Sequence, residues 1–345
     1  MSIDKVVYIG KRRDDVVNAP APLAALGMAR QPGATHFRRN HFPVPALDAG
    51  TWALAIGGAV AEPRVLAAAD LRAFEHRTLP VVLECAGHRR DEFDPPAPGL
   101  RWGAGAASEA RWTGVPLAAV LEAAGIADDG VEVVLRGADG DGYARSLPME
   151  KALHPDTLLA LFMNGEPIPP VYGGPVRAIV HGWYGMDSVK WLAAIHVARR
   201  PFDGPFQVRD YRWRVPGEPG PGSRIDRLAV QSLITSPAEG SRVPHGAARI
   251  RGAAWSGAGG IAAVAVSIDG GRFCDARLHP APGPYARTLW ELEAVLGPGR
   301  HEIASRATDV HGEVQPQRPL PNAGGYCNNA VHRLGVTADE GKEVV

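Results

Sequence analysis

A short segment rich in proline and glycine divides this chain into two parts with different hydrophobic patterns. Residues 215–222 contain three prolines and three glycines, and such a segment can sustain neither a helix nor a central strand. Glycine and proline are frequent elsewhere too, with 41 and 31 residues among 345, which favours short elements joined by turns. The sequence therefore predicts two domains, residues 1–222 and residues 223–345.

The first part has the mixed pattern of an α+β domain. Residues 117–124 carry apolar side chains at helical spacing and stop before Gly125, so they predict a helix. A shorter helix is expected at residues 67–74. Apolar runs bounded by turn residues predict strands. These strands are expected at residues 52–56, 81–83, 132–136, 176–180 and 189–197.

The second part has the alternation that is typical of half-buried strands. Val264, Val266 and Ile268 alternate with smaller residues, and Asp269-Gly270-Gly271 follows them. An Asp-Gly pair after such a run is typical of a tight hairpin turn. Further short strands are expected at residues 249–252, 285–289 and 301–307. The pattern predicts a β-sandwich.

The overall charge and the cysteines exclude several classes of protein. Lys and Arg total 37 and so do Asp and Glu, so no net field favours nucleic acid or a membrane surface. No stretch approaches the roughly 20 apolar residues of a membrane span. The three cysteines, Cys85, Cys274 and Cys327, are far apart, which argues against a disulfide framework, a zinc ribbon or covalently attached haem.

The beginning of the chain has a weak similarity to an export signal. Lys11-Arg12-Arg13 is a basic run of the kind that precedes a signal sequence, but two aspartates follow it at once. Pro20 and Pro22 interrupt the only apolar stretch, so the long apolar region of such a signal is missing. The sequence therefore predicts a cytoplasmic rather than a periplasmic protein.

Cys85 is the residue with the most specific chemical environment. It follows an apolar run that ends a predicted buried strand, and Arg89 and Arg90 lie just beyond it. A cysteine near guanidinium charge loses its proton more readily, and the thiolate binds soft transition metals. The alternative is a buried structural thiol, because free cysteine is among the most buried residue types. The local sequence leaves both interpretations open.

Three other segments carry polar groups that could bind a ligand. Arg39, Asn40 and His41 lie between an aromatic residue and two prolines, and their directed donors suit a phosphate or a planar heterocycle. A solvated loop is the alternative there.

The other two segments are rich in glycine. Residues 173–190 include Arg177, Ser188 and Lys190, whose side chains could bind phosphate while the glycines let backbone donors approach. An ordinary turn between strands is the alternative. Asp139 lies in a glycine-rich run where aspartates are common in turns, although its carboxylate could accept hydrogen bonds from a pterin-like ring.

Taken together, these segments resemble the sulfite oxidase family of molybdenum cofactor enzymes. Six segments occur in the order typical of that family, and three later segments are similar to its immunoglobulin-like dimerisation domain. The resemblance extends from about Phe37 to Val336. The six are residues 39–45, 85–87, 100–102, 110–117, 163–167 and 188–192, and the later three are residues 230–237, 252–257 and 269–271.

The resemblance implies both a fold and a chemistry. It implies an α+β molybdopterin-binding domain of the sulfite oxidase type, followed by an immunoglobulin-like β-sandwich that mediates homodimerisation. It implies that Cys85 is the protein ligand to molybdenum, and that Arg39, Arg90, Trp102 and Tyr211 surround an anionic, sulfite-like substrate. The residues expected to hold the molybdopterin are Arg39, Asn40, His41, Cys85, Asp139, Arg177, Ser188 and Lys190.

The resemblance also implies the reaction and its partners. A relative of this kind oxidises sulfite or a related sulfur compound by oxygen-atom transfer. No haem-binding domain is recognisable in this chain, so we expect an external electron acceptor such as a cytochrome c. The alternatives are a related enzyme that reduces nitrate or a sulfoxide, and a non-catalytic binding module on the same fold.

Three positions depart from the family pattern. His88 stands where many relatives have asparagine, and Tyr172 stands where a cofactor-binding histidine is usual. Gly324 stands where animal sulfite oxidases supply a further substrate-binding arginine. A lost charge-assisted contact is worth about 1.5–3 kcal/mol. We therefore expect weaker sulfite binding, or a different oxyanion or oxo compound as substrate.

Overall fold

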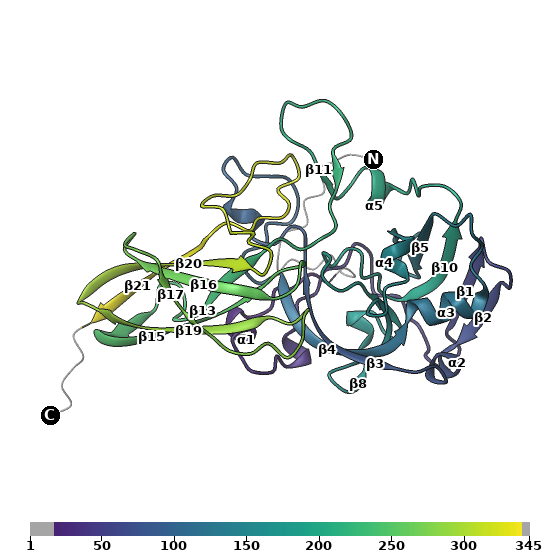
Figure 1. Ribbon diagram of the computed structural model, residues 1–345, viewed down its shortest axis with the longest axis horizontal. Coiled ribbons are helices and arrows are strands. Elements are labelled where there is room, and N and C mark those ends of the chain that lie inside the picture. The colour runs from purple at the N-terminus through teal and green to yellow at the C-terminus, as the bar shows by residue number, and fades with distance from the viewer. Residues whose placement is uncertain (1–16, 340–345) are drawn as a thin grey trace.

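The computed structural model describes residues 17–339. The basic run at residues 11–13 and the aspartates after it lie outside the described residues. Figure 1 shows two lobes: a mixed α+β part at the right and a β-sandwich at the left. The predicted α+β fold with an immunoglobulin-like sandwich is confirmed. No described helix is long and apolar enough to cross a membrane.

The first lobe contains two five-stranded sheets. One has the order β2-β1-β10-β5-β6, in which β1 and β10 are parallel and the other neighbours are antiparallel. The other has the order β3-β4-β7-β8, with β9 paired to β7. Their bounds are β1 Ala53–Gly58, β2 Arg64–Ala67, β3 Arg77–Glu84, β4 Ala107–Pro116, β5 Glu132–Gly137, β6 Ala144–Pro148, β7 Leu158–Met163, β8 Glu166–Pro167, β9 Arg177–Ile179 and β10 Leu192–Ala198.

The helices of this lobe are short, as the glycine and proline content predicts. The predicted helix at residues 117–124 is α3, and Gly125 ends it in a left-handed conformation with φ of 69°, which glycine adopts without steric cost. The predicted helix at residues 67–74 is found as α2, one turn long. The helices are α1 Leu23–Leu26, α2 Ala68–Arg72, α3 Leu117–Ala124, α4 Met149–Ala152 and α5 Pro205–Val208, and the 3₁₀ turns are η1 Gly33–Thr35, η2 Arg90–Glu92 and η3 Pro170–Tyr172.

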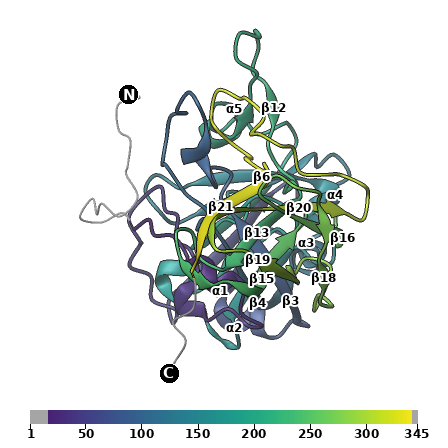
Figure 2. The same cartoon turned by 90° about the vertical axis from the view of Figure 1, so that its left-hand side faces the viewer.

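The second lobe is a sandwich of two sheets, of which Figure 2 gives an end-on view. The sheet orders are β13-β15-β19-β18 and β14-β21-β20-β16-β17. Ile250, Val264, Trp290 and Ile303 are almost fully buried in one core cluster between the sheets. The strands are β13 Gln231–Ser236, β14 Arg242–Pro244, β15 Gly246–Trp255, β16 Ile261–Ile268, β17 Cys274–Asp275, β18 Arg277–Leu278, β19 Thr288–Leu296, β20 Gly299–Asp309 and β21 His332–Asp339.

The expected hairpin after residue 268 is confirmed. Asp269 and Gly270 have φ of 52° and 70°, as the two central residues of a tight hairpin turn require. The turn closes through a hydrogen bond from the amide of Gly271 to the carbonyl of Ile268, with N and O 2.9 Å apart. The next strand, β17, pairs back onto β16.

Two predicted strands begin later than the sequence pattern indicated. The strand expected at residues 189–197 begins at Leu192, because Trp191 has a φ of 49° and interrupts the extended backbone. The strand expected at residues 285–289 begins at Thr288. The residues before Thr288 contact the first lobe instead: the carbonyl of Tyr285 accepts a hydrogen bond from the amide of Val82, 3.0 Å away.

The predicted linker at residues 215–222 forms the tip of a small hairpin. Two short strands, β11 (Arg212–Trp213) and β12 (Ser223–Arg224), pair on either side of it. This hairpin projects at the top of Figure 1. Gly217, Gly220 and Gly222 have φ between 70° and 116°, so the chain reverses there instead of running straight to the second lobe.

Candidate active site

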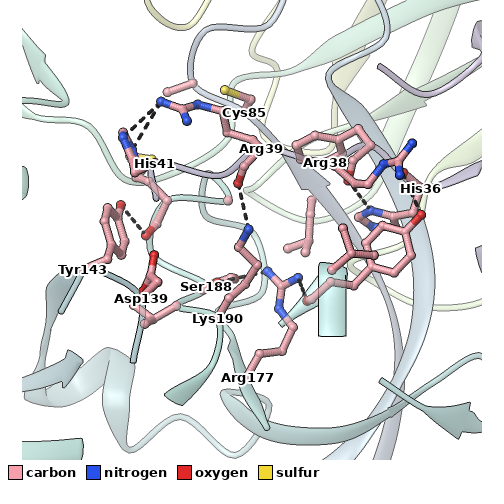
Figure 3. A pocket seen from close by; sticks show the side chains of 18 of the residues that line it. His36, Arg38, Arg39, His41, Cys85, Asp139, Tyr143, Arg177, Ser188 and Lys190 are labelled. Carbon is pink, nitrogen blue, oxygen red and sulfur yellow. Dashed lines mark hydrogen bonds between the residues drawn. The ribbon is translucent and has the colours of Figure 1, made fainter. Parts of the chain in front are cut away.

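A deep pocket in the first lobe brings together most of the predicted site residues. The space between its lining atoms, including the open mouth, is about 720 Å³, within the usual size of ligand sites. Figure 3 shows the side chains that converge on it. Eight of the predicted residues line the pocket: Arg39, His41, Cys85, Asp139, Arg177, Ser188, Lys190 and Tyr211.

Cys85 lies in the pocket wall at the end of β3. Its amide donates to the carbonyl of Ala106 at 2.9 Å, which continues the pairing of β3 with β4 by one residue. Its carbonyl accepts from the amide of His88 at 2.8 Å, so the chain turns directly after the cysteine. The Sγ atom is 3.4 Å from the amide nitrogen of Gly87. These contacts fix the thiol at the end of the strand. The residue is buried, with 8% of its surface exposed.

Arg39 and His41 form a second part of the wall. The Nη2 atom of Arg39 is 3.1 Å from Nδ1 of His41, and Nε2 of His41 is 2.6 Å from the hydroxyl of Tyr211. Tyr211 has a φ of 55°, a conformation that costs energy for a bulky residue and often occurs at functional sites. These contacts hold His41 between a guanidinium and a phenol.

Arg177 and Lys190 form the opposite wall, below the centre of Figure 3. Arg177 donates from Nη1 to the carbonyl of Tyr172 at 2.8 Å and from Nη2 to the carbonyl of Ser188 at 3.0 Å. Lys190 donates from Nζ to the carbonyl of Arg39 at 2.8 Å. Gly173 permits this packing, because a Cβ atom there would lie 2.6 Å from Cγ of Lys190.

The pocket is strongly positive. Arg38, Arg39, Arg177 and Lys190 line it, whereas Asp139 is the one carboxylate among the residues that line it. Burial lowers the pKa of Arg177 to about 9. Burial also lowers the pKa of Lys190 well below its ordinary value, and the charges of Arg177 and Arg39 add to this effect. Such crowding of cations favours binding of an anion.

Burial and nearby charges also shift the pKa values of the two histidines and the aspartate in the pocket. The pKa of His36 falls to about 3, because burial and the nearby charges of Arg177 and Lys190 disfavour the imidazolium. Burial, with help from Arg39 and Lys190, likewise lowers the pKa of His41 well below its ordinary value. Burial raises the pKa of Asp139. Both imidazoles are therefore neutral near pH 7 and can act as hydrogen-bond partners.

Three predicted site residues do not line the pocket. Asn40 lies directly behind it, where its Oδ1 atom accepts from Nζ of Lys190. Trp102 is fully buried in a core cluster that also includes Cys85. Arg90 is enclosed by other residues: its Nη1 atom donates to the carbonyl of Leu100, and its Nε atom donates to the carbonyls of Gly324 and Gly325.

The structure gives two of the family departures a specific packing role. Nδ1 of His88 is 3.0 Å from Oε1 of the buried Glu84, and its ring stacks near that of Trp255. The hydroxyl of Tyr172 donates to the carbonyls of Ala34 and His36, at 3.3 and 3.2 Å. His88 therefore helps to fix the end of β3 beside Cys85, and Tyr172 helps to fix residues 34–36. Both segments contribute residues to the lining of the pocket.

Several residues of the site were not identified from sequence. His36 and Arg38 line the pocket and directly precede the predicted cluster, which was the only signal for them. Asn18 accepts through Oδ1 from the amide of Asn40 at 3.0 Å. Arg145 forms a buried ion pair with Asp187, with Nε and Oδ1 2.8 Å apart. The partners of Asn18 and Arg145 are distant in sequence, so no local pattern could predict these contacts.

The chemistry of the pocket fits a cofactor with a soft metal at one end and an anion at the other. Within residues 17–339 no group of three or more His, Cys, Asp or Glu side chains could hold a metal, so a metal at Cys85 would have to bring ligands of its own. The buried Nε atoms of Arg38 and Arg177 have no partner among the described residues. Such buried donors favour a ligand rich in acceptors.

Comparison with known proteins assigns both parts of the chain to domains of molybdenum-cofactor oxidoreductases. The family described as "Oxidoreductase molybdopterin binding domain" matches residues 41–206, and the family described as "Mo-co oxidoreductase dimerisation domain" matches residues 223–339. Mitochondrial sulfite oxidase of Macaca fascicularis is 37% identical over 332 residues, which cover 88% of this chain and 61% of that protein. An inducible NADH nitrate reductase of Glycine max is 32% identical, over 88% of this chain and 39% of its own length.

A solved structure is similar over almost the whole chain. The sulfane dehydrogenase SoxCD from Paracoccus pantotrophus matches with a TM-score of 0.87 and 30% identity, over 97% of this chain and 88% of its own. The chain thus spans about 61% of the mammalian relative but most of the bacterial one. With both domains matched in order and eight of the expected residues lining the pocket, this chain belongs to the sulfite oxidase family of molybdopterin oxidoreductases.

Proposed function

We propose that this protein is a molybdenum-cofactor oxidoreductase that oxidises sulfite or a related sulfur compound. In this reaction the sulfur gains one oxygen that derives from water, and two protons and two electrons are released. The electrons pass to an external acceptor such as a cytochrome c.

The observation that supports the proposal is that one pocket is lined both by a single thiol and by a cluster of cationic side chains. Cys85, Arg39, Arg177 and Lys190 line the same pocket. A thiolate suits a soft metal, and charge-assisted donors suit a phosphate. We propose that Cys85 binds molybdenum, and that the molybdopterin is held by Arg39, Asn40, His41, Asp139, Arg177, Ser188 and Lys190.

The bound cofactor would supply oxygen-atom transfer and storage of the two electrons. The residues of this chain would bind and orient the reactants. Arg39 would attract an anionic substrate. Its guanidinium donates to Nδ1 of His41, so Nε2 of this imidazole donates to the hydroxyl of Tyr211, 2.6 Å away, and orients it. Because His41 is buried and its pKa is lowered, the imidazole stays neutral and keeps this arrangement.

The likeness to a plant nitrate reductase keeps oxygen transfer in the other direction as a second candidate. At 32% identity over 88% of this chain, that likeness favours neither direction. Purified protein is therefore assayed with sulfite and an oxidising dye, and separately with nitrate or a sulfoxide and a reduced dye. Turnover of nitrate alone would refute the proposed direction.

Elemental analysis tests whether the pocket holds the cofactor at all. In a host that makes the cofactor, we expect about one molybdenum per chain. Cys85→Ser should lose most of the metal or nearly all activity, because a serine hydroxyl is a poor ligand for a soft metal. Cys274→Ser is the matched control, since Cys274 is exposed in the second lobe.

The outcomes of this test separate the classes of function. Wild-type protein without molybdenum, purified from such a host, would favour the non-catalytic binding module. Full activity in Cys85→Ser would show that the thiol is not the ligand. Stoichiometric zinc in place of molybdenum would also contradict the proposal.

A further inference from the structure

Two segments, residues 36–38 and 172–177, contribute four polar side chains to one end of the pocket. These side chains are His36, Arg38, Tyr172 and Arg177. The ring centres of His36 and Tyr172 are 5.6 Å apart, and Arg177 donates to the carbonyl of Tyr172. In Figure 3, His36 and Arg38 lie on the opposite side of the pocket from Asp139. Which of the four can bind an anion depends on the donors that the protein itself leaves unused.

His36 and Tyr172 have no donor left for an anion. Nδ1 of His36 is 3.0 Å from the carbonyl oxygen of Phe37, so this nitrogen carries the hydrogen and Nε2 can only accept. The pKa of this imidazole is about 3, so it binds no second proton near pH 7. The single hydroxyl hydrogen of Tyr172 faces two acceptors, the carbonyls of Ala34 and His36. Neither side chain can therefore donate to a bound anion.

Arg38 and Arg177 both keep unused donors at this end of the pocket. Arg177 donates one N–H of each terminal nitrogen to the carbonyls of Tyr172 and Ser188, and its buried Nε atom has no partner among the described residues. The Nε atom of Arg38 is likewise buried without a partner there. Buried donors of this kind favour a ligand rich in acceptors.

The main chain fixes the position from which the Arg38 side chain extends. The amide of Arg38 donates to the carbonyl of Ala19 at 2.8 Å, and its carbonyl accepts from the amide of Ala19 at 2.9 Å. The amide of Phe37 donates to the hydroxyl of Ser108 in β4 at 2.9 Å. The backbone around Arg38 is therefore held from both sides, and its half-buried side chain lines the pocket.

The charges and donors at this end suit a phosphate monoester. Arg38, Arg177 and Lys190 are cations that line the same pocket. A phosphate group offers three strong acceptor oxygens and nearly two negative charges. The planar fork of a guanidinium matches such oxygens in pairs. Cys85 lines the pocket as well, so one ligand can contact both the thiol and these cations.

We infer that Arg38 is a further binding residue for the phosphate group of molybdopterin and that it shares this group with Arg177. The identity of the ligand rests on the proposed function, whereas its class, a phosphate monoester, follows from the donors and charges. Tyr172 contributes no donor to the phosphate, because its hydroxyl is used by the main chain. Arg38 supplies the donor instead.

Binding of inorganic phosphate tests the role of Arg38 without turnover. The full chain is purified from a host that cannot make the cofactor and is titrated by calorimetry at about pH 8, where phosphate is mostly a dianion. Arg38→Met keeps an unbranched stem but removes the guanidinium, and it should weaken phosphate binding roughly 10-fold or more, the loss of one charge-assisted hydrogen bond. Arg38→Lys should lie between wild type and Arg38→Met, because an ammonium group keeps the charge but not the fork.

Arg30→Met is the matched control for these titrations. Arg30 is exposed and does not line the pocket, so its replacement removes the same charge without removing a contact. This variant should keep the phosphate affinity of the wild type. Thermal unfolding of all three variants without phosphate separates a loss of binding from a loss of fold, and Arg38→Lys serves as the comparison if Arg38→Met folds poorly.

Release of the cofactor tests the identity of the ligand. Protein from a host that makes the cofactor is passed over gel filtration after increasing times, and the pterin that it retains is oxidised and measured by fluorescence. Differences in affinity at one site appear mostly in the dissociation rate. Arg38→Met should therefore release the pterin roughly 10-fold faster than wild type, whereas Arg30→Met should release it at the wild-type rate.

The outcomes distinguish this inference from the proposed function. Unchanged phosphate affinity in Arg38→Met, or an equal loss in Arg30→Met, would overturn the inference even if the protein contained molybdenum and oxidised sulfite. Weaker phosphate binding with unchanged release of the pterin would overturn the assignment to the cofactor and show a site for a free anion. Conversely, suppose that wild-type protein from a cofactor-making host binds phosphate through Arg38 but contains neither molybdenum nor pterin. That result would support the phosphate contact of Arg38 and refute the proposed function.

Discussion

Lys190 illustrates how single residues prepare this pocket for an anion. Its ammonium group is buried, donates to the carbonyl of Arg39, and lies 4.3 Å from the centre of the Trp191 ring. Burial and the charges of Arg177 and Arg39 lower its pKa well below the ordinary value, and the charge of Asp139 offsets only part of this effect. At any given pH the free protein therefore keeps a smaller fraction of this lysine in its ammonium form than a solvent-exposed lysine would have.

This lowered pKa predicts that anion binding takes up a proton. A bound anion stabilises the ammonium form, so the complex holds more protons than the free protein, and affinity must fall as pH rises through the lowered pKa that Lys190 has in the free protein. Sulfate is a suitable probe because it does not titrate there. Calorimetry in two buffers of different ionisation enthalpy should show proton uptake in wild-type protein and much less in Lys190→Met.

Lys151 provides the control for this prediction. Its pKa is also lowered by burial, to about 8, but it does not line the pocket. Lys151→Met should therefore keep the proton uptake of the wild type. Heats that are independent of the buffer in wild-type protein would contradict the role assigned to Lys190.

At the scale of elements, the end of β3 is tied to the second lobe directly beside Cys85. Glu84 is 1% exposed, and its Oε2 atom accepts from Nε1 of Trp255 in β15 at 2.7 Å. Its other oxygen is 3.0 Å from Nδ1 of His88. A buried carboxylate must be paired in this way to avoid a large desolvation cost. The contact fixes the strand that presents the thiol.

Loss of this hydrogen bond should therefore destabilise the fold more than loss of a buried indole whose nitrogen has no hydrogen-bond partner. Trp255→Phe leaves an oxygen of Glu84 without a donor, and we expect a loss of about 1–3 kcal/mol in the free energy of unfolding. Trp290→Phe is the matched control, because Trp290 is equally buried in the sandwich but its Nε1 atom has no partner among the described residues. Chemical denaturation of both variants measures the difference. Equal losses would show that the Glu84 contact contributes little.

At the scale of the whole molecule, buried polar contacts join the two lobes. Arg287 pairs with Glu109 and donates from Nε to the carbonyl of Leu26 at 2.7 Å. Arg89 donates to Oε1 of Gln231 at 3.1 Å and to the carbonyl of Ala330 at 2.6 Å. A sandwich held this firmly can carry a second subunit without disturbing the pocket.

We expect this sandwich to mediate a homodimer. The match of residues 223–339 to a dimerisation domain supports this expectation, and Val295 in β19, which pairs with the exposed Ala247 of β15, is 80% exposed. Size exclusion with light scattering should give twice 36.5 kDa at micromolar concentration, and Val295→Asp should shift the mass toward the monomer. Val65→Asp, at a site 70% exposed in the first lobe, should remain dimeric. A monomeric wild type would contradict this expectation.

Sequence alone predicted those features that depend on local chemistry. The helix at residues 117–124 is found with the predicted bounds, because apolar spacing and Gly125 act within a few residues. The hairpin at Asp269-Gly270 follows from the same kind of local preference. Cys85, Arg177 and Lys190 were recognisable because their segments keep the order of a known family, and the fold brings them into one pocket.

Only the tertiary structure decided which of these groups remain available to a ligand. Arg90 was expected to face a substrate, and the fold directs its Nε donor to the carbonyls of Gly324 and Gly325, more than 230 residues away. Gly324 suggested only a missing charge, whereas the folded chain places the ring of Tyr326 in that space. Side chains distant in sequence compete for the same volume and the same hydrogen bonds, and that competition exists only once the chain is folded.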